Sequence, residues 1–170
     1  DSHVASLYGI TDATSGTSNG KFTLIGNQNG KNDSDKNVAF YPFIEGIECE
    51  SINTEYQISN IFLPENQNYT AESFANGTFL MAAFSKNSNL QFKNILGAFN
   101  LKLIGDSKIK SIKLEGNNNE KLSGKATVTV CTDGTAPSII MENEASTSVT
   151  LDCGEGVQLN PNKATPFIMA

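Results

Sequence analysis

Apolar and polar residues alternate along much of this chain with a period of two. The pattern is clearest in 99–103, where every second residue is apolar, and it returns in 109–114 and 126–131. A period of two is that of a β-strand with one buried face, whereas an amphipathic helix repeats its apolar residues every three to four positions. No convincing helical pattern is present, so the sequence predicts an all-β fold.

The most regular stretch is FNLKLIGDSKIKSIKLEG, residues 99–116. Its two alternating runs are separated by GDS (105–107), a turn signal, and are therefore predicted to form adjacent antiparallel strands of one hairpin. The residues expected on the buried face of this hairpin are Phe99, Leu101, Leu103, Ile112 and Leu114, and those expected on its soluble face are Lys102, Lys110 and Lys113.

Further strands are expected in 20–26, 38–43, 56–69, 77–85, 126–131, 149–153 and 154–159. Pro42 marks a strand end or a sheet edge, because proline cannot donate to a β-ladder, and Pro64 divides 56–69 into one or two short strands. The run 77–85 is predicted as a buried strand, with a short helix in 72–84 as the alternative.

Without crossover helices, a parallel α/β sheet is disfavoured against an antiparallel β-sandwich. The expected organisation is a flexible N-terminal segment, 1–19, and one β-sandwich domain, 20–170.

Composition narrows the class of protein. The net charge is −6, and all twelve basic residues are lysines, so a nucleic-acid backbone would meet repulsion and no bidentate arginine partners. Charged residues make up only 18% of a chain rich in Asn, Ser, Thr and Gly, a balance typical of exported β-rich proteins. No run is long enough to cross a bilayer as a helix, and the N-terminus lacks the pattern of a signal peptide. Any signal or lipid anchor is expected to have been removed.

Residues that would carry catalysis are few. His3 is the only histidine and lies at a terminus expected to fray, which argues against a nucleophile and histidine pair. Glu45, Glu48 and Glu50 are close enough in sequence to suggest a carboxylate pair, but a solvated turn explains them better, since the chain has no tryptophan to form a sugar platform. We therefore predict that the protein is not an enzyme and has no catalytic residues or cofactor.

Two kinds of short motif, a pair of aspartates and the glycosylation sequon, occur in this sequence. Asp33 and Asp35 have the spacing of a calcium loop, but the later bidentate glutamate is missing, so no metal site is predicted. Asn32, Asn68 and Asn76 match the glycosylation sequon, which matters only in a eukaryotic secretory route.

The three cysteines, Cys49, Cys131 and Cys153, form no pattern that would bind zinc. A disulfide between Cys131 and Cys153 is one possibility, because both lie near the ends of predicted strands. Free buried thiols are the other.

Several phrases occur in an order that resembles the fimbrillin-like proteins of Bacteroidales, a family that includes type V pilins and related cell-surface lipoproteins. They are FYPF (40–43), LPENQNY (63–69), MAAFS (81–85), the stretch 90–128 and the tail VTLDCGEGVQLNPNKATPFIMA. The resemblance extends over 20–170 and is most specific in 92–124.

The resemblance implies a transthyretin-like, Greek-key β-sandwich, usually followed by a second β-sandwich domain beyond a point corresponding to residue 170. It also implies export by the lipoprotein route to the outer membrane, anchoring through a lipidated N-terminus of the precursor, and a fimbrial or fimbria-associated role. Pilins of the family assemble with other pilus subunits by strand donation after an Arg-specific protease removes an N-terminal strand. This chain contains no arginine, so such a cleavage site is expected outside it.

Strand donation requires a sandwich with a strand missing, which leaves an apolar groove flanked by unpaired backbone groups. We expect its walls to include 22–25 or 149–151; the individual ligand-binding residues are unknown. The alternative function is a solitary surface module that binds a glycan or a host protein through the loops 27–37 and 115–121. Tyr56 and Tyr69 are its candidate ligand-binding aromatics, with ordinary core packing as their other explanation.

Overall fold

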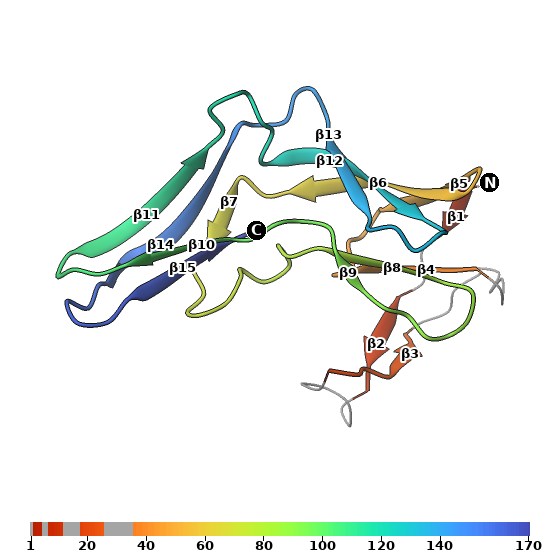
Figure 1. Ribbon diagram of the computed structural model, residues 1–170, viewed down its shortest axis with the longest axis horizontal. Coiled ribbons are helices and arrows are strands. Elements are labelled where there is room, and N and C mark those ends of the chain that lie inside the picture. Colours follow the sequence, from red (N-terminus) through yellow and green to blue (C-terminus); the bar gives the residue numbers. More distant parts are fainter. Residues whose placement is uncertain (1, 5–6, 12–17, 26–35) are drawn as a thin grey trace.

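The computed structural model describes residues 2–4, 7–11, 18–25 and 36–170. All the regular structure in these residues is β, which confirms the all-β class. The molecule is elongated, and its strands form several mainly antiparallel sheets that face one another across two cores, as in a β-sandwich (Figure 1). The alternative of a helix in 72–84 is wrong, because that region contains the strand β8 (Met81–Ser85).

One half of the molecule consists of a five-stranded and a three-stranded sheet. The larger sheet has the order β1 (Ser2–Val4), β5 (Glu48–Ile52), β6 (Glu55–Leu63), β12 (Gly124–Cys131) and β13 (Ser138–Met141). The smaller has the order β4 (Asn37–Tyr41), β8 and β9 (Lys93–Asn94). The first core joins them and consists of Tyr56, Ile58, Ile61, Leu63, Leu80, Ala82, Val128 and Val130.

The other half also has two sheets. One has the order β11 (Lys108–Glu115), β14 (Ser148–Gln158) and β7 (Asn66–Asn68), and the other pairs β10 (Phe99–Leu103) with β15 (Thr165–Met169). Val149, Leu151, Leu159, Phe167 and Met169 form the second core between them. A separate two-stranded sheet pairs β2 (Tyr8–Ile10) with β3 (Phe22–Leu24). Thus β1 and β2 lie within the segment 1–19 that was expected to be flexible, and its mobility stays a prediction.

Several local predictions are confirmed. The strand β4 ends at Tyr41, directly before Pro42, and lies at the edge of its sheet. Pro64 separates β6 from β7. On β12, Ala126, Val128 and Val130 are buried while the residues between them point outward, as the alternation requires.

The predicted hairpin of 99–116 is wrong, although its faces are largely right. The strand β10 pairs with β15, and β11 pairs with β14, so the turn at 105–107 carries the chain from one sheet to the other. Leu101, Leu103, Ile112 and Leu114 still pack against the second core, but from two opposite sheets. Phe99 is 41% exposed and lies outside that core. Alternation determines which side of a strand is buried, but it carries no information about the neighbouring strand.

The last strands also differ from expectation. The stretch 154–159 was predicted to turn and start a new strand, but β14 continues through it to Gln158. Gly154 and Gly156 have positive φ angles of 58° and 102° inside this strand, a conformation that glycine adopts without steric cost. The final strand, β15, was not predicted; its residues TPFIM have a proline in second position and lack alternation.

Candidate functional site

The residues considered for catalysis do not converge on a site. The backbone of His3 pairs with that of Cys49 across β1 and β5. Glu48 and Glu50 are exposed on β5, and Glu45 is exposed in the turn before it. In the part of the chain that the structure describes, no three His, Cys, Asp or Glu residues are grouped so that they would hold a metal ion.

The loop motifs are only partly visible. Asp33, Asp35 and Asn32 lie outside the described residues. Asn68 and Asn76 are both exposed, Asn68 on β7 and Asn76 in the connection before β8. Thr78 of the second sequon is buried and its hydroxyl donates to the carbonyl of Ala75, so the asparagine of that sequon is accessible but its threonine is not.

All three cysteines are free thiols, so the suggested disulfide between Cys131 and Cys153 is wrong. Each thiol is half-buried, and desolvation raises its pKa. A neighbouring carboxylate raises the pKa further: Glu50 for Cys49, Asp152 for Cys153, and chiefly Glu55 for Cys131. The reactive thiolate is therefore disfavoured at neutral pH, which suits structural cysteines better than nucleophiles or metal ligands.

Neither candidate tyrosine is available as an exposed aromatic platform. Tyr56 is 7% exposed and stacks on Phe84 in the first core, with ring centroids 5.9 Å apart. Tyr69 is half-buried and packs on Phe167 at 5.3 Å in the second core. Both are ordinary core aromatics, and they belong to different halves of the molecule.

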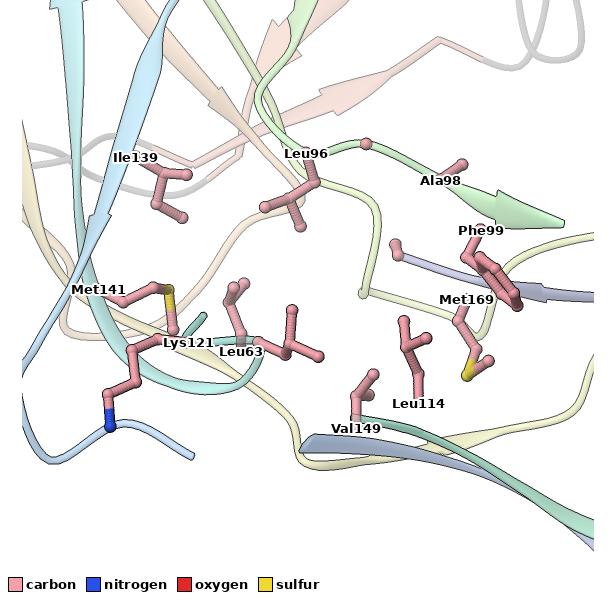
Figure 2. Close-up of a pocket in the computed structure, with 13 residues that line it drawn as sticks. Leu63, Leu96, Ala98, Phe99, Leu114, Lys121, Ile139, Met141, Val149 and Met169 are labelled. Carbon is pink, nitrogen blue, oxygen red and sulfur yellow. The ribbon is translucent and has the colours of Figure 1, made fainter. Parts of the chain in front are cut away.

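An apolar groove of about 340 Å³ lies where the two cores meet. Figure 2 shows its open centre, with Leu63, Ile139 and Met141 on one side and Phe99, Leu114 and Met169 on the other. The residues that line it are Leu63, Leu96, Gly97, Ala98, Phe99, Leu114, Lys121, Leu122, Ile139, Met141, Val149, Met169 and Ala170. The groove therefore draws its walls from both halves of the molecule.

One wall of the groove is an edge strand. Ile139 and Met141 belong to β13, which pairs with β12 on one side and ends the sheet order on the other. The backbone groups on the outer side of an edge strand have no ladder partner and are free to bind another strand. An apolar groove beside such an edge has the two features that an added strand requires.

Of the two walls expected from the sequence, one is present. Val149 lines the groove, whereas none of the side chains described in 22–25 does. The sequence did not identify Ile139 or Met141, because SIIM is too short and too uniformly apolar to predict a strand with a defined face. Met169 was missed together with β15.

The chemistry available in the groove is limited. Among the described residues that line it, Lys121 alone has a charged side chain, and the other residues are aliphatic, aromatic, sulfur-containing or glycine. Such a surface binds apolar side chains by excluding water, and it offers no nucleophile and no acid and base pair. The groove is suited to binding.

Comparison with known proteins places no relative beside this chain: no family model matches it, and neither the curated proteins nor the solved structures contain a match. None of the described segments is a helix long and apolar enough to span a membrane. The fold itself defines the class at the level of an all-β protein with a sandwich-like arrangement of sheets.

Proposed function

We propose that this protein is a non-enzymatic structural or adhesive subunit of the cell surface, fimbrial or fimbria-associated, which assembles with other subunits by β-strand donation. The observation that carries the proposal is the apolar groove beside the edge strand β13. The resemblance of 20–170 to fimbrillin-like proteins supports the same function and a transthyretin-like, Greek-key sandwich.

A donated strand gains two kinds of stabilisation at once. Its backbone satisfies the free amides and carbonyls along β13, and every second side chain enters the groove between the cores. Ile139 and Met141 supply apolar contacts from β13 itself, while Phe99 and Met169 supply them from the opposite half. Burial of apolar side chains stabilises such a complex by about 25 cal/mol for each Å² of apolar surface removed from water.

We also propose that this protein acts at the cell surface. Subunits of this kind are exported and anchored in the outer membrane through a lipidated N-terminus of the precursor, and protease maturation frees them to polymerise. A composition with few charges and many Asn, Ser, Thr and Gly residues supports an exported protein.

The test is to fill the groove without disturbing either core. Ala98 is exposed and lines the groove, so the larger side chain of Ala98→Trp should occupy groove space from a position outside both cores. The matched control is Ala136→Trp, at an exposed loop position outside the groove. After protease maturation, we expect a ladder of polymers on denaturing gels for the wild type and for Ala136→Trp, and its loss for Ala98→Trp. A ladder of equal intensity in all three proteins would refute the groove as the acceptor.

A solitary module that binds a glycan or a host protein is the second function suggested by the sequence. This second function is less well supported. Binding of a glycan would require exposed tyrosines, and both Tyr56 and Tyr69 pack into cores. A wild-type protein that stays monomeric after maturation, with no fibres in electron micrographs, would favour this second function.

A further inference from the structure

A second hollow lies on the outward face of the five-stranded sheet and borders the apolar groove at Met141, which lines both. It has a volume of about 610 Å³, and its lining includes Gln57, Thr127, Thr129, Ile140, Glu142 and Glu144; we call it the acidic hollow. Ile140 is 69% exposed, the most exposed of the large apolar residues that the structure describes. A hollow lined by one exposed aliphatic side chain and two carboxylates fits an apolar group that is flanked by cations.

The carboxylates of the hollow are free to meet such a partner. Glu142 and Glu144 are exposed on a turn that is closed by the hydrogen bond from the amide of Ala145 to the carbonyl of Glu142, at 3.0 Å. Among the described residues, the one ion pair is between Lys113 and Glu115, on a different sheet. Neither carboxylate therefore forms an ion pair within the described part of the chain, although Lys125 lies opposite Glu142, whose amide donates to the carbonyl of Lys125.

The same chain carries a complementary projection. The connection 104–107, between β10 and β11, lies at one end of the long axis, far from β13 (Figure 1). Ile104 is 63% exposed there, and Lys102 and Lys108 are exposed on either side of it. We call these three residues the lysine tip. The exposed Asp106 lies between Ile104 and Lys108, so the segment 102–108 carries two positive charges against one negative charge. Lys102 and Ile104 are two positions apart along an extended chain, so they point to the same side.

Hydrogen bonds hold the connection 104–107 in place. The amide of Gly105 donates to the carbonyl of Asn160 at 3.2 Å, and the amide of Leu159 donates to the carbonyl of Ser107 at 2.9 Å. The side chain of Gln158 adds a bond to the carbonyl of Asp106 at 2.6 Å. A large apolar side chain exposed on a preorganised turn loses little entropy on binding.

We propose that the lysine tip of one copy of this protein docks into the acidic hollow of a second copy. Ile104 packs on Ile140, and the flanking Lys102 and Lys108 face Glu142 and Glu144. Three features of the lysine tip and the acidic hollow support this contact. Their charges are opposite, one surface projects while the other is concave, and Ile104 and Ile140 are both highly exposed. This contact is distinct from strand donation, since it uses the outward-facing side chain of Ile140 on β13 and not the backbone groups along the free edge of that strand.

The two surfaces are different patches, so the contact is heterologous and can repeat from copy to copy. One copy uses its tip and leaves its own hollow free for the next. In a chain with a net charge of −6, such a contact would align subunits that otherwise repel one another. The contact would be salt-sensitive, because exposed charge pairs are screened.

The test uses reciprocal charge reversal and sedimentation velocity on the whole chain. We expect the wild type to associate in about 0.01 M NaCl and to dissociate in about 1 M NaCl, as the Debye length falls from roughly 30 to roughly 3 Å. The tip variant Lys102→Glu/Lys108→Glu and the hollow variant Glu142→Lys/Glu144→Lys should each self-associate at least about tenfold more weakly. An equimolar mixture of the two should recover association, because each tip then meets a hollow of opposite charge.

Matched controls separate local contacts from net charge. Lys36→Glu/Lys86→Glu and Glu45→Lys/Glu72→Lys change the net charge by the same amounts at exposed positions outside the tip and the hollow, and both should associate like the wild type. Folding of each variant is checked by its thermal melt. A wild type that is monomeric in low salt, or a mixture of folded variants that stays monomeric, overturns the proposal.

Failure of this contact and failure of strand donation give different results. Ala98→Trp should leave the salt-sensitive association unchanged, because Ala98 lies in the apolar groove. The charge reversals should leave any ladder on denaturing gels unchanged, because denaturant disrupts a contact made by exposed charges.

Discussion

The side chain of Gln67 binds both backbone groups of Ala170, although the two residues are 103 positions apart. Gln67 Nε2 donates to the carbonyl of Ala170 at 2.6 Å, and the amide of Ala170 donates to Gln67 Oε1 at 3.2 Å. Gln67 is 3% exposed on β7, and Ala170 follows β15. An amide side chain therefore links the two sheets of the second half in the manner of a β-bridge.

Removing this link should destabilise the protein. Gln67→Met keeps the length of the side chain but leaves the amide and carbonyl of Ala170 without their partner, so we expect a loss of about 1 to 3 kcal/mol in the free energy of unfolding. Urea denaturation measures it. Gln91→Met is the control, because Gln91 is exposed and should change stability by less than about 0.5 kcal/mol. Equal losses in the two variants would mean that the Gln67 bonds contribute nothing.

The assignment of faces on β10 is tested by truncating one side chain on each side. Leu101 packs against the second core and lies opposite the buried Phe167, so Leu101→Ala should cost about 2 kcal/mol or more. Ile104→Ala, at a 63% exposed position just beyond the strand, should cost less than about 0.5 kcal/mol. Thermal melts of the two variants give the comparison. A shift near zero for Leu101→Ala would show that the faces are reversed.

Two glycines separate the effect of backbone conformation from that of a steric clash. Gly124 and Gly134 have φ angles of 118° and 86°, both unfavourable for other residues. A Cβ on Gly124 would lie 2.9 Å from the Cα of Ala145, whereas a Cβ on Gly134 would meet nothing within 4 Å. We expect Gly134→Ala to cost about 1 to 2 kcal/mol from conformation alone, and Gly124→Ala to cost clearly more. Chemical denaturation of the two variants in parallel will show whether the clash adds to the strain.

The free thiols should react slowly at neutral pH. Burial and neighbouring carboxylates raise the pKa of Cys49, Cys131 and Cys153, so less of each thiol is ionised than in an unfolded chain. With Ellman's reagent, we expect the folded protein to react more slowly than the urea-unfolded protein at pH 7 to 8, with the rate rising as pH increases beyond the ordinary thiol pKa of about 8.5. Rapid reaction of the folded protein at pH 7 would contradict the raised pKa values.

Part of the candidate site was predictable from the sequence. Val149 was expected in a groove wall, since it lies in a clearly alternating strand. Ile139 and Met141 were not, because a four-residue apolar strand has no pattern that assigns its face. Met169 was not expected either, because it lies on β15, a strand that contains a proline and was not predicted. The groove is formed by residues from both halves, and only the folded chain brings them together.

The sequence by itself determined the class of structure and the buried side of the main strands. Successive side chains of an extended chain point in opposite directions, so alternation in 99–103, 112–114 and 126–131 assigns their faces locally. Ile109 is three positions from Ile112 and packs against the same core because the register shifts between Ile109 and Ser111. Tertiary structure decided the partners: β10 lies beside β15 and β11 beside β14, although a short turn joins β10 to β11. Backbone hydrogen bonds are the same for any neighbouring strand. The choice of partner therefore depends on which arrangement buries Leu101 and Ile112 against one core from opposite sheets, and that is a property of the whole chain.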